Sequence, residues 1–161
     1  MHSSVTFEVG YLGGSFKGQF REIAAELVVD GERASLTGSS PVASIDVKDE
    51  NLAAHLQSPD FFDAERNPEL SFGAEGLSLE GDQVEVPGEL TIKGVTKPVV
   101  ATGSIIPTLT DGYGRERVGL KLSTTADRTD FGIDWNMPLP SGEPALSNEV
   151  TIEADLYFTK A

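Results

Sequence analysis

Strict alternation of side chains marks the stretch Val150-Thr151-Ile152-Glu153-Ala154-Asp155-Leu156-Tyr157-Phe158. Successive side chains of an extended chain point to opposite faces, so a period of two indicates a half-buried β-strand. The stretch therefore predicts a strand whose apolar face carries Val150, Ile152, Ala154, Leu156 and Phe158. That face has to be buried against another part of the sheet or against a ligand.

The same pattern recurs along the chain between turn signals. Alternating or β-branched runs cover residues 15–20, 23–29, 83–92, 96–106 and 115–126. The residue pairs that separate these runs favour tight hairpins, because glycine, asparagine and aspartate tolerate positive φ. These turn pairs are Asp30-Gly31, Gly81-Asp82, Lys93-Gly94 and Asp111-Gly112. The order predicts an all-β protein, an antiparallel sandwich or barrel.

Two segments depart from this pattern. Residues 49–58 place Leu52 and Leu56 four positions apart, with a capping aspartate before them and a Ser-Pro pair after them, which predicts a short helix. Residues 128–147 contain three prolines and the only tryptophan, Trp135. Loops of this length are uncommon unless they have a function, so we interpret the segment as a functional or lid-like loop.

Composition restricts the class of protein. The 161 residues predict one domain, residues 1–161. Twelve Lys and Arg face 26 Asp and Glu, and the formal net charge of -14 argues against nucleic-acid partners and anionic membrane surfaces. No apolar run approaches the ~18 residues of a membrane span, so we expect no stable membrane insertion. The absence of cysteine excludes disulfides, thiolate metal sites and a cysteine nucleophile.

Residues 1–8 have neither a basic n-region nor an apolar stretch of about 7–15 residues, so they do not resemble a signal peptide. This favours the cytoplasm, or the periplasm or exterior if the chain is a mature form.

No catalytic or metal-binding pattern stands out. The two histidines, His2 and His55, cannot supply a three-histidine zinc site, and no Gly-x-Ser-x-Gly motif accompanies His55. A surface or packing role is the better interpretation of His55. Asp127, Asp130 and Asp134 lack the spacing of a calcium loop and are better explained by capping and turn formation. We therefore predict no catalytic residue, no metal and no enzymatic activity.

Eight phenylalanines lie on the predicted strands or beside the helix and loop. They could form an ordinary core, or they could line a cavity, since an eight-stranded barrel encloses space for side chains or for one ligand. The pattern leaves a filled and a hollow barrel open. The absence of a second layer of helices slightly favours a hollow one.

Three blocks of the chain match a known family signature in order and spacing. The first runs from Ser44-Ile45-Asp46-Val47-Lys48 through 51–63 (NLAAHLQSPDFFD) to 67–72 (NPELSF). The second is 88–99 (GELTIKGVTKPV), and the third is 128–133 (RTDFGI) with the strand after Asn148. Together they resemble the YceI-like family, lipocalin-like proteins that bind polyisoprenoids.

The resemblance implies a lipocalin-like, extended antiparallel barrel of eight strands with a short helix. Its hydrophobic tunnel would hold an isoprenoid chain, in some members the tail of a quinone, for carriage, storage or sensing. It implies no general catalytic residue and no cofactor apart from such a bound lipid or quinone. The partner expected is thus an isoprenoid-type lipid, and a homodimer is left open.

We expect the tunnel to be lined by large apolar residues, some selected by strand alternation and others by size alone. They are Phe16, Phe20, Ile45, Leu52, Leu56, Phe61, Phe62, Phe72, Leu90, Ile92, Leu120, Leu122, Phe131, Trp135 and Phe158. Two alternatives remain at this point. One is a small lipid-acting enzyme, which would need a polar group such as His55 in the tunnel. The other is a barrel plugged by its own side chains that serves as an interaction module.

Overall fold

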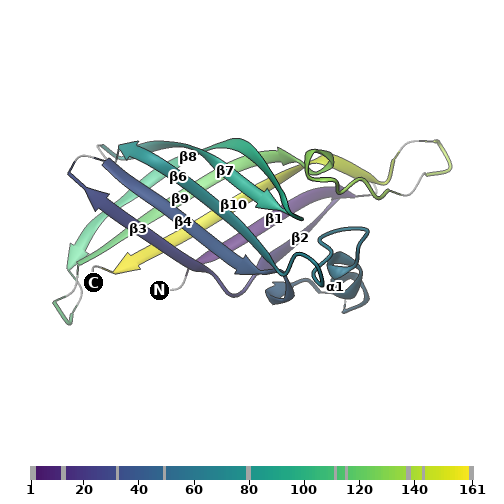
Figure 1. The fold of residues 1–161 in the computed structure, drawn as a ribbon, viewed down its shortest axis with the longest axis horizontal. Coiled ribbons are helices and arrows are strands. Elements are labelled where there is room, and N and C mark those ends of the chain that lie inside the picture. The colour runs from purple at the N-terminus through teal and green to yellow at the C-terminus, as the bar shows by residue number, and fades with distance from the viewer. Residues whose placement is uncertain are drawn as a thin grey trace.

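The computed structural model describes residues 3–11, 14–31, 33–48, 50–78, 81–110, 112–114, 116–136, 139–142 and 144–159. The described residues form ten strands, one α-helix and two short 3-10 helices (Figure 1). The strands are β1 (Ser4–Tyr11), β2 (Gly14–Phe20), β3 (Ala24–Asp30), β4 (Arg33–Pro41), β5 (Ile45–Asp46), β6 (Glu69–Ser78), β7 (Gln83–Ile92), β8 (Val95–Thr110), β9 (Glu116–Asp127) and β10 (Leu146–Thr159). The helices are η1 (Val42–Ser44), α1 (Glu50–Gln57) and η2 (Arg128–Phe131).

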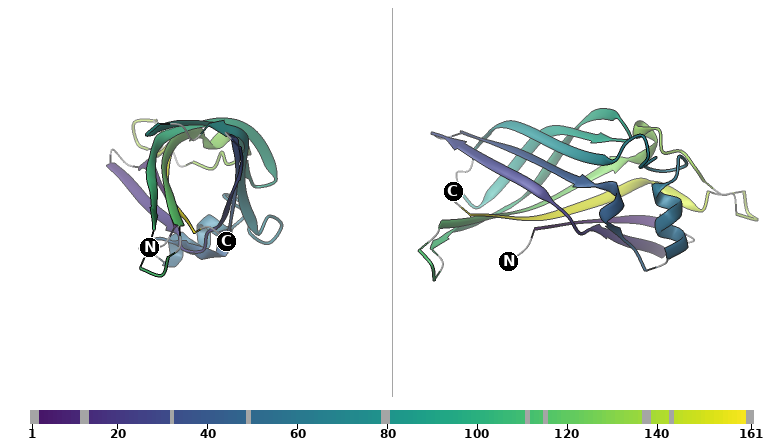
Figure 2. Two further views of the ribbon diagram at one scale, coloured as in Figure 1. Left: turned by 90° about the vertical axis from the view of Figure 1, so that its left-hand side faces the viewer. Right: turned by 60° about the horizontal axis from the view of Figure 1, so that its bottom comes forward.

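All strands belong to one antiparallel sheet, in the order β3-β4-β6-β7-β8-β9-β10-β1-β2-β5. The sheet curls into a half-barrel, and the view along its long axis shows the strands arranged around an open centre (Figure 2). Strand β3 lies at one edge of the sheet and contacts β10 on the opposite wall. Ala25 and Leu27 of β3, and Ile23 just before the strand, pack against the core cluster that contains Leu156. Side-chain packing therefore brings the two sides of the curled sheet together at a place where the strands are not joined by backbone hydrogen bonds.

The all-β prediction is confirmed, with the helix at residues 50–57 and a sheet of the lipocalin-like kind. The strand number was wrong: the described sheet has ten strands, where eight were expected. One of the additional strands is β5, only two residues long, which pairs with the end of β2 at Gln19 and Phe20. A pairing this short leaves no periodic pattern in the sequence.

The hairpin predicted at Lys93-Gly94 is present between β7 and β8. Both residues have positive φ, 54° and 75°, as a two-residue hairpin with the twist of its strands requires. Lys93 Nζ also donates hydrogen bonds to the carbonyls of Pro59, at 2.7 Å, and Gly132, at 3.4 Å. The turn is thereby tied to the segment after α1 and to the residue that follows η2.

The core has two parts. The distal core lies at the end of the half-barrel remote from α1 and consists of Ala34, Leu36, Ala74, Leu77, Val84, Val86, Ala101, Leu120, Leu122 and Leu156. The proximal core lies beside α1 and consists of Val9, Phe20, Ile45, Leu56, Phe61, Ile133 and Leu146. The site described below lies between the two. No helix in the described ranges is long and apolar enough to cross a membrane.

Candidate functional site

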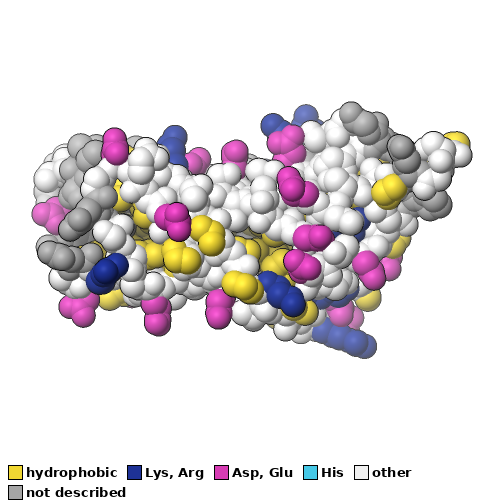
Figure 3. Space-filling view, turned by 90° about the horizontal axis from the view of Figure 1, so that it is seen from above, with side chains coloured by type: hydrophobic (Ala, Val, Ile, Leu, Met, Phe, Trp, Pro, Cys, Tyr) yellow, Lys and Arg dark blue, Asp and Glu magenta, His cyan; other side chains and the backbone are white. Residues whose placement is uncertain are grey.

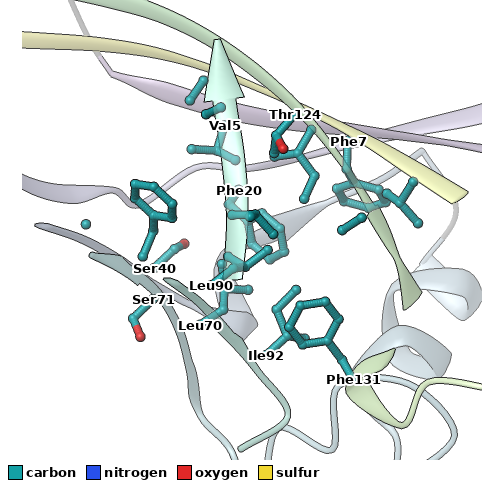
Figure 4. Close-up of a pocket in the computed structure, with 18 of the residues that line it drawn as sticks. Val5, Phe7, Phe20, Ser40, Leu70, Ser71, Leu90, Ile92, Thr124 and Phe131 are labelled. Atoms are coloured by element: carbon teal, nitrogen blue, oxygen red, sulfur yellow. The ribbon is translucent and has the colours of Figure 1, made fainter. Parts of the chain in front are cut away.

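A cavity lies inside the half-barrel, between the distal and proximal cores, and its wall is almost entirely apolar (Figure 4). Its volume is about 200 Å³, more than ten times the ~10–15 Å³ that accommodates one buried water molecule. Cavities of this size with few polar partners stay dry and take up apolar molecules. The structure therefore shows a half-barrel that is filled at one end and hollow beyond it.

The register of β1 and β10 explains how the wall forms. Val5 pairs with Ala154, Phe7 with Ile152, and Val9 with Val150, and all six side chains line the cavity. Alternate residues on each strand share a face, so two neighbouring strands present a continuous apolar surface to the interior.

Three aromatic rings lie next to one another along the cavity wall. The ring centroids of Phe7 and Phe20 are 5.8 Å apart, and those of Phe20 and Phe62 are 5.9 Å apart. Glycine makes room for the first ring: a Cβ added at Gly18, which faces Phe7 across β1 and β2, would lie 2.5 Å from the ring carbon Cζ. The rings provide large apolar area at the α1 end of the cavity.

A second aromatic group lies at the α1 end, behind the cavity wall. His55 lies 4.9 Å from Phe61 and 4.8 Å from Trp135 between ring centroids, and Phe61 and Trp135 are 5.4 Å apart. His55 Nε2 is 3.1 Å from a carboxylate oxygen of Asp60. His55 and Trp135 pack behind Phe61 and do not line the cavity, so the imidazole serves a packing role here.

Two hydroxyl groups of the lining, those of Ser40 and Thr124, have partners within the protein. Thr124 Oγ1 donates to the carbonyl of Val100 at 2.9 Å, and the hydroxyl oxygens of Ser40 and Ser44 are 3.1 Å apart. Among the described residues, every buried side-chain nitrogen and oxygen has a hydrogen-bond partner. The cavity consequently selects for shape and apolarity more than for hydrogen bonds.

Arg128 is the charged residue of the lining, and it is only 7% exposed. Its Nη1 donates to the carbonyls of Ile133 and Trp135, both at 2.8 Å, and its Nε donates to the carbonyl of Ser147 at 2.9 Å. Burial lowers the pKa of the guanidinium, while the nearby carboxylates of Asp127 and Asp134 oppose that shift. Arg128 thus holds Ile133, Trp135 and Ser147 in place through their main-chain carbonyls.

The residue before η2 caps it. The side chain of Asp127 accepts hydrogen bonds from the hydroxyl and from the backbone N–H of Thr129, at 2.5 and 2.9 Å. These two bonds lower the pKa of Asp127. This aspartate therefore has the capping role expected from the sequence. No group of three or more His, Asp or Glu residues within the described ranges is arranged to hold a metal ion.

A groove on the outside of β3, β4, β6 and β7 adjoins the cavity. The two share Ile23, Ala25, Gly38, Ser39, Ser71 and Phe72. Glu26, Glu75 and Glu89 lie along the groove. Acidic side chains also surround hydrophobic ones on the face seen from above (Figure 3). The wall between cavity and solvent is thin where Phe72 contributes to both surfaces.

The structure brings nine of the fifteen predicted lining residues onto the cavity wall. They are Phe20, Leu56, Phe61, Phe62, Phe72, Leu90, Ile92, Leu122 and Phe131. That these residues contact a ligand remains a prediction.

Five of the predicted residues lie off the wall, and the Phe16 side chain is outside the described part of the structure. Ile45, Leu52 and Trp135 pack in or against the proximal core, behind the layer that faces the cavity. Leu120 is in the distal core and Phe158 packs against it, beyond the end of the hollow. Choosing residues for their size did not separate the lining from the packed core.

Several lining residues were missed although the pattern contained them. Val150, Ile152, Ala154 and Leu156 all line the cavity. They belong to the predicted apolar face of β10, of which the expected lining includes only the largest residue, Phe158. The period of two was thus a better guide than side-chain volume. Smaller contributors such as Gly38 carry no sequence signal of this kind.

The sequence profile of the YceI-like domain matches residues 1–158 of this chain. A UPF0312 protein of Vibrio cholerae serotype O1 is 35% identical over 139 residues, which cover 82% of this chain and 72% of that protein.

Two solved structures share the fold. Burkholderia cenocepacia BcnA superimposes with a TM-score of 0.81 at 21% identity, over 97% of this chain and 96% of BcnA. A polyisoprenoid binding domain from Saccharophagus degradans, implicated in plant cell wall breakdown, superimposes with a TM-score of 0.73. That domain is 12% identical, and the match covers 99% of this chain and 94% of the domain. At these identities the likeness establishes the fold.

Proposed function

The chain belongs to the YceI-like family, and from this membership we propose that it binds a polyisoprenoid, such as the tail of an isoprenoid quinone, in its internal cavity. The observation that carries the proposal is the apolar cavity of about 200 Å³ inside the curled sheet. The family and the polyisoprenoid binding domain of similar fold support lipophilic ligand binding in general. They also favour a binding protein over an enzyme.

Burial of apolar area supplies the affinity. Removing a hydrocarbon carbon from water is worth ~0.8 kcal/mol, so an isoprene unit of five carbons contributes roughly 4 kcal/mol before the costs of ordering the chain. A branched, unsaturated chain also suits a wall of aliphatic and aromatic side chains. Carriage, storage and sensing would each require this binding step.

The first experiment is mass spectrometry of an organic extract from the purified protein, together with native mass spectrometry. We expect one isoprenoid per chain, either copurified or taken up from added farnesol or geranylgeraniol. A folded protein that is empty and takes up neither compound would refute the proposal.

Two adjacent residues of β10 provide a matched control. Ile152 lines the cavity, whereas Thr151 is its neighbour on the opposite face of the strand. Replacing Ile152 with Trp should fill the cavity and abolish uptake. Replacing Thr151 with Trp should leave uptake unchanged, and equal loss in both variants would show that binding occurs elsewhere.

A further inference from the structure

The cavity ends along three cross-strand pairs at the distal core. In each pair one residue lines the cavity and its partner belongs to the distal core without lining it. The pairs are Leu36 with Ala74, Ala101 with Val86, and Leu156 with Leu120. The boundary between hollow and filled barrel is therefore a defined level that runs across several strands.

The filled side of this boundary is closely packed. Val86 and Leu120 are both 0% exposed, and Leu77, deeper in the distal core, is 2% exposed. Protein interiors are packed as densely as organic crystals, with few voids larger than a water molecule. An apolar chain in the cavity would thus stop at these side chains on the side of the distal core, because each further carbon must displace one of them.

We propose that Val86 and Leu120 form a floor that sets the length of the isoprenoid chain the cavity accepts. This inference rests on the proposed function and adds a determinant of specificity to it. A chain that reaches the floor buries as much apolar surface as the cavity accommodates, whereas a longer chain leaves more of its length exposed or forces the floor apart. Chain length is then discriminated by side chains far from the α1 end.

Strand β7 offers two valines that separate this effect from a general loss of packing. Val86 lies opposite Ala101, which lines the cavity, whereas Val84 lies opposite Gly103, which does not. Both valines are buried on the inner face, at 0% and 6% exposure. Val86→Ala and Val84→Ala remove the same two methyl groups, but only the first deepens the cavity.

A substitution that makes the cavity shallower is available at the same level of the half-barrel. Ala101 lines the cavity and is 5% exposed. Ala101→Val would raise the floor by two methyl groups, and Leu120→Ala would lower it on the β9 side. These variants should move the length preference in opposite directions.

The test is competition between farnesol, geranylgeraniol and longer all-trans polyprenols for each variant, read by native mass spectrometry. We expect Val86→Ala and Leu120→Ala to raise the affinity ratio of longer to shorter chains roughly tenfold, as one methylene of pocket space does. Ala101→Val should lower that ratio, and Val84→Ala should leave it unchanged.

The outcomes that overturn the floor differ from those that overturn binding. If the unaltered protein takes up no isoprenoid, the proposed function fails and the floor fails with it. If the protein binds but Val84→Ala shifts the ratio as much as Val86→Ala, or if neither Leu120→Ala nor Ala101→Val shifts it, binding stands and the floor is refuted. Ala101→Val removes no packing, so it keeps the test decisive should a truncated variant fail to fold.

Discussion

Leu120 and Leu156 face each other across β9 and β10, yet only Leu156 reaches the cavity. Leu120 is completely buried in the distal core. Within one cross-strand pair the interior thus changes from close-packed to hollow. A packed end supplies hydrophobic stabilisation without a ligand, and this leaves the remaining length of the sheet free to enclose one.

This division predicts opposite effects of the same substitution at two alanines. Ala154→Ile adds three carbons beside the cavity, so it should stabilise the ligand-free protein by about 1 kcal/mol and weaken isoprenoid binding. Ala34→Ile adds them to the distal core, where overpacking should cost about 1–3 kcal/mol. Denaturant unfolding of the ligand-free proteins measures both. Equal destabilisation would mean that the cavity is collapsed in solution.

A charge on the aromatic wall should impair binding more than folding. Phe62 lines the cavity, is partly buried, and packs edge-on against Phe20 at 5.9 Å. Phe62→Arg places a guanidinium beside an apolar chain, where it has to stay hydrated, so uptake of geranylgeraniol should fall at least tenfold. Val100→Arg, at a position 52% exposed, is the control and should change neither uptake nor melting temperature. Undiminished uptake by folded Phe62→Arg protein would place the ligand elsewhere.

The sequence was sufficient for the fold class because β7, β9 and β10 alternate over long stretches. Strands β4 and β6 were not distinguished, since glycine, serine and alanine occupy many of their positions. Their register also shifts between Ala34 and Leu36, which interrupts the period of two. Pairing with the neighbouring strands, and not their own composition, makes these segments part of the sheet.

The site could be predicted as an apolar surface but not as a bounded cavity. Leu120 and Leu122 carry the same pattern on the same face of β9, and only Leu122 lines the cavity. What separates them is the packing of other strands, such as Val86 on β7, at one level of the barrel. The α1 end shows the same limit, because the sequence does not reveal that Phe61 stands in front of Trp135.

The Asp127 cap should make stability depend on pH in the acid range. Its pKa is lower in the folded protein than the usual 3.8, because Thr129 donates two hydrogen bonds to it. The cap therefore contributes stability above the unfolded pKa and loses it as the pH falls through the folded pKa. Asp127→Ala should lower the melting temperature at neutral pH, and the difference should shrink in acid. A difference that stays constant over this range would exclude the carboxylate as its source.

Among the charged residues, Arg128 should be the one whose replacement lowers the free energy of unfolding most. Arg128→Met preserves an apolar stem at the cavity wall but leaves the carbonyls of Ile133, Trp135 and Ser147 without their donor. Each buried acceptor left unpaired costs about 1–3 kcal/mol, and water reaching some of them limits the total, so we expect a loss of about 3 kcal/mol.

The matched control is the exposed Arg21, which pairs with Asp46 at 2.6 Å on the surface. Arg21→Met should cost less than about 1 kcal/mol, because solvent screens such pairs. Guanidinium unfolding compares the two variants, and amide exchange of residues 133–136 should accelerate only in Arg128→Met. Equal losses, or unchanged exchange, would show that the loop is held by its own backbone contacts.

Arg128→Lys separates charge from geometry: an ammonium lacks the planar fork that reaches several carbonyls at once, so it should recover only part of the loss.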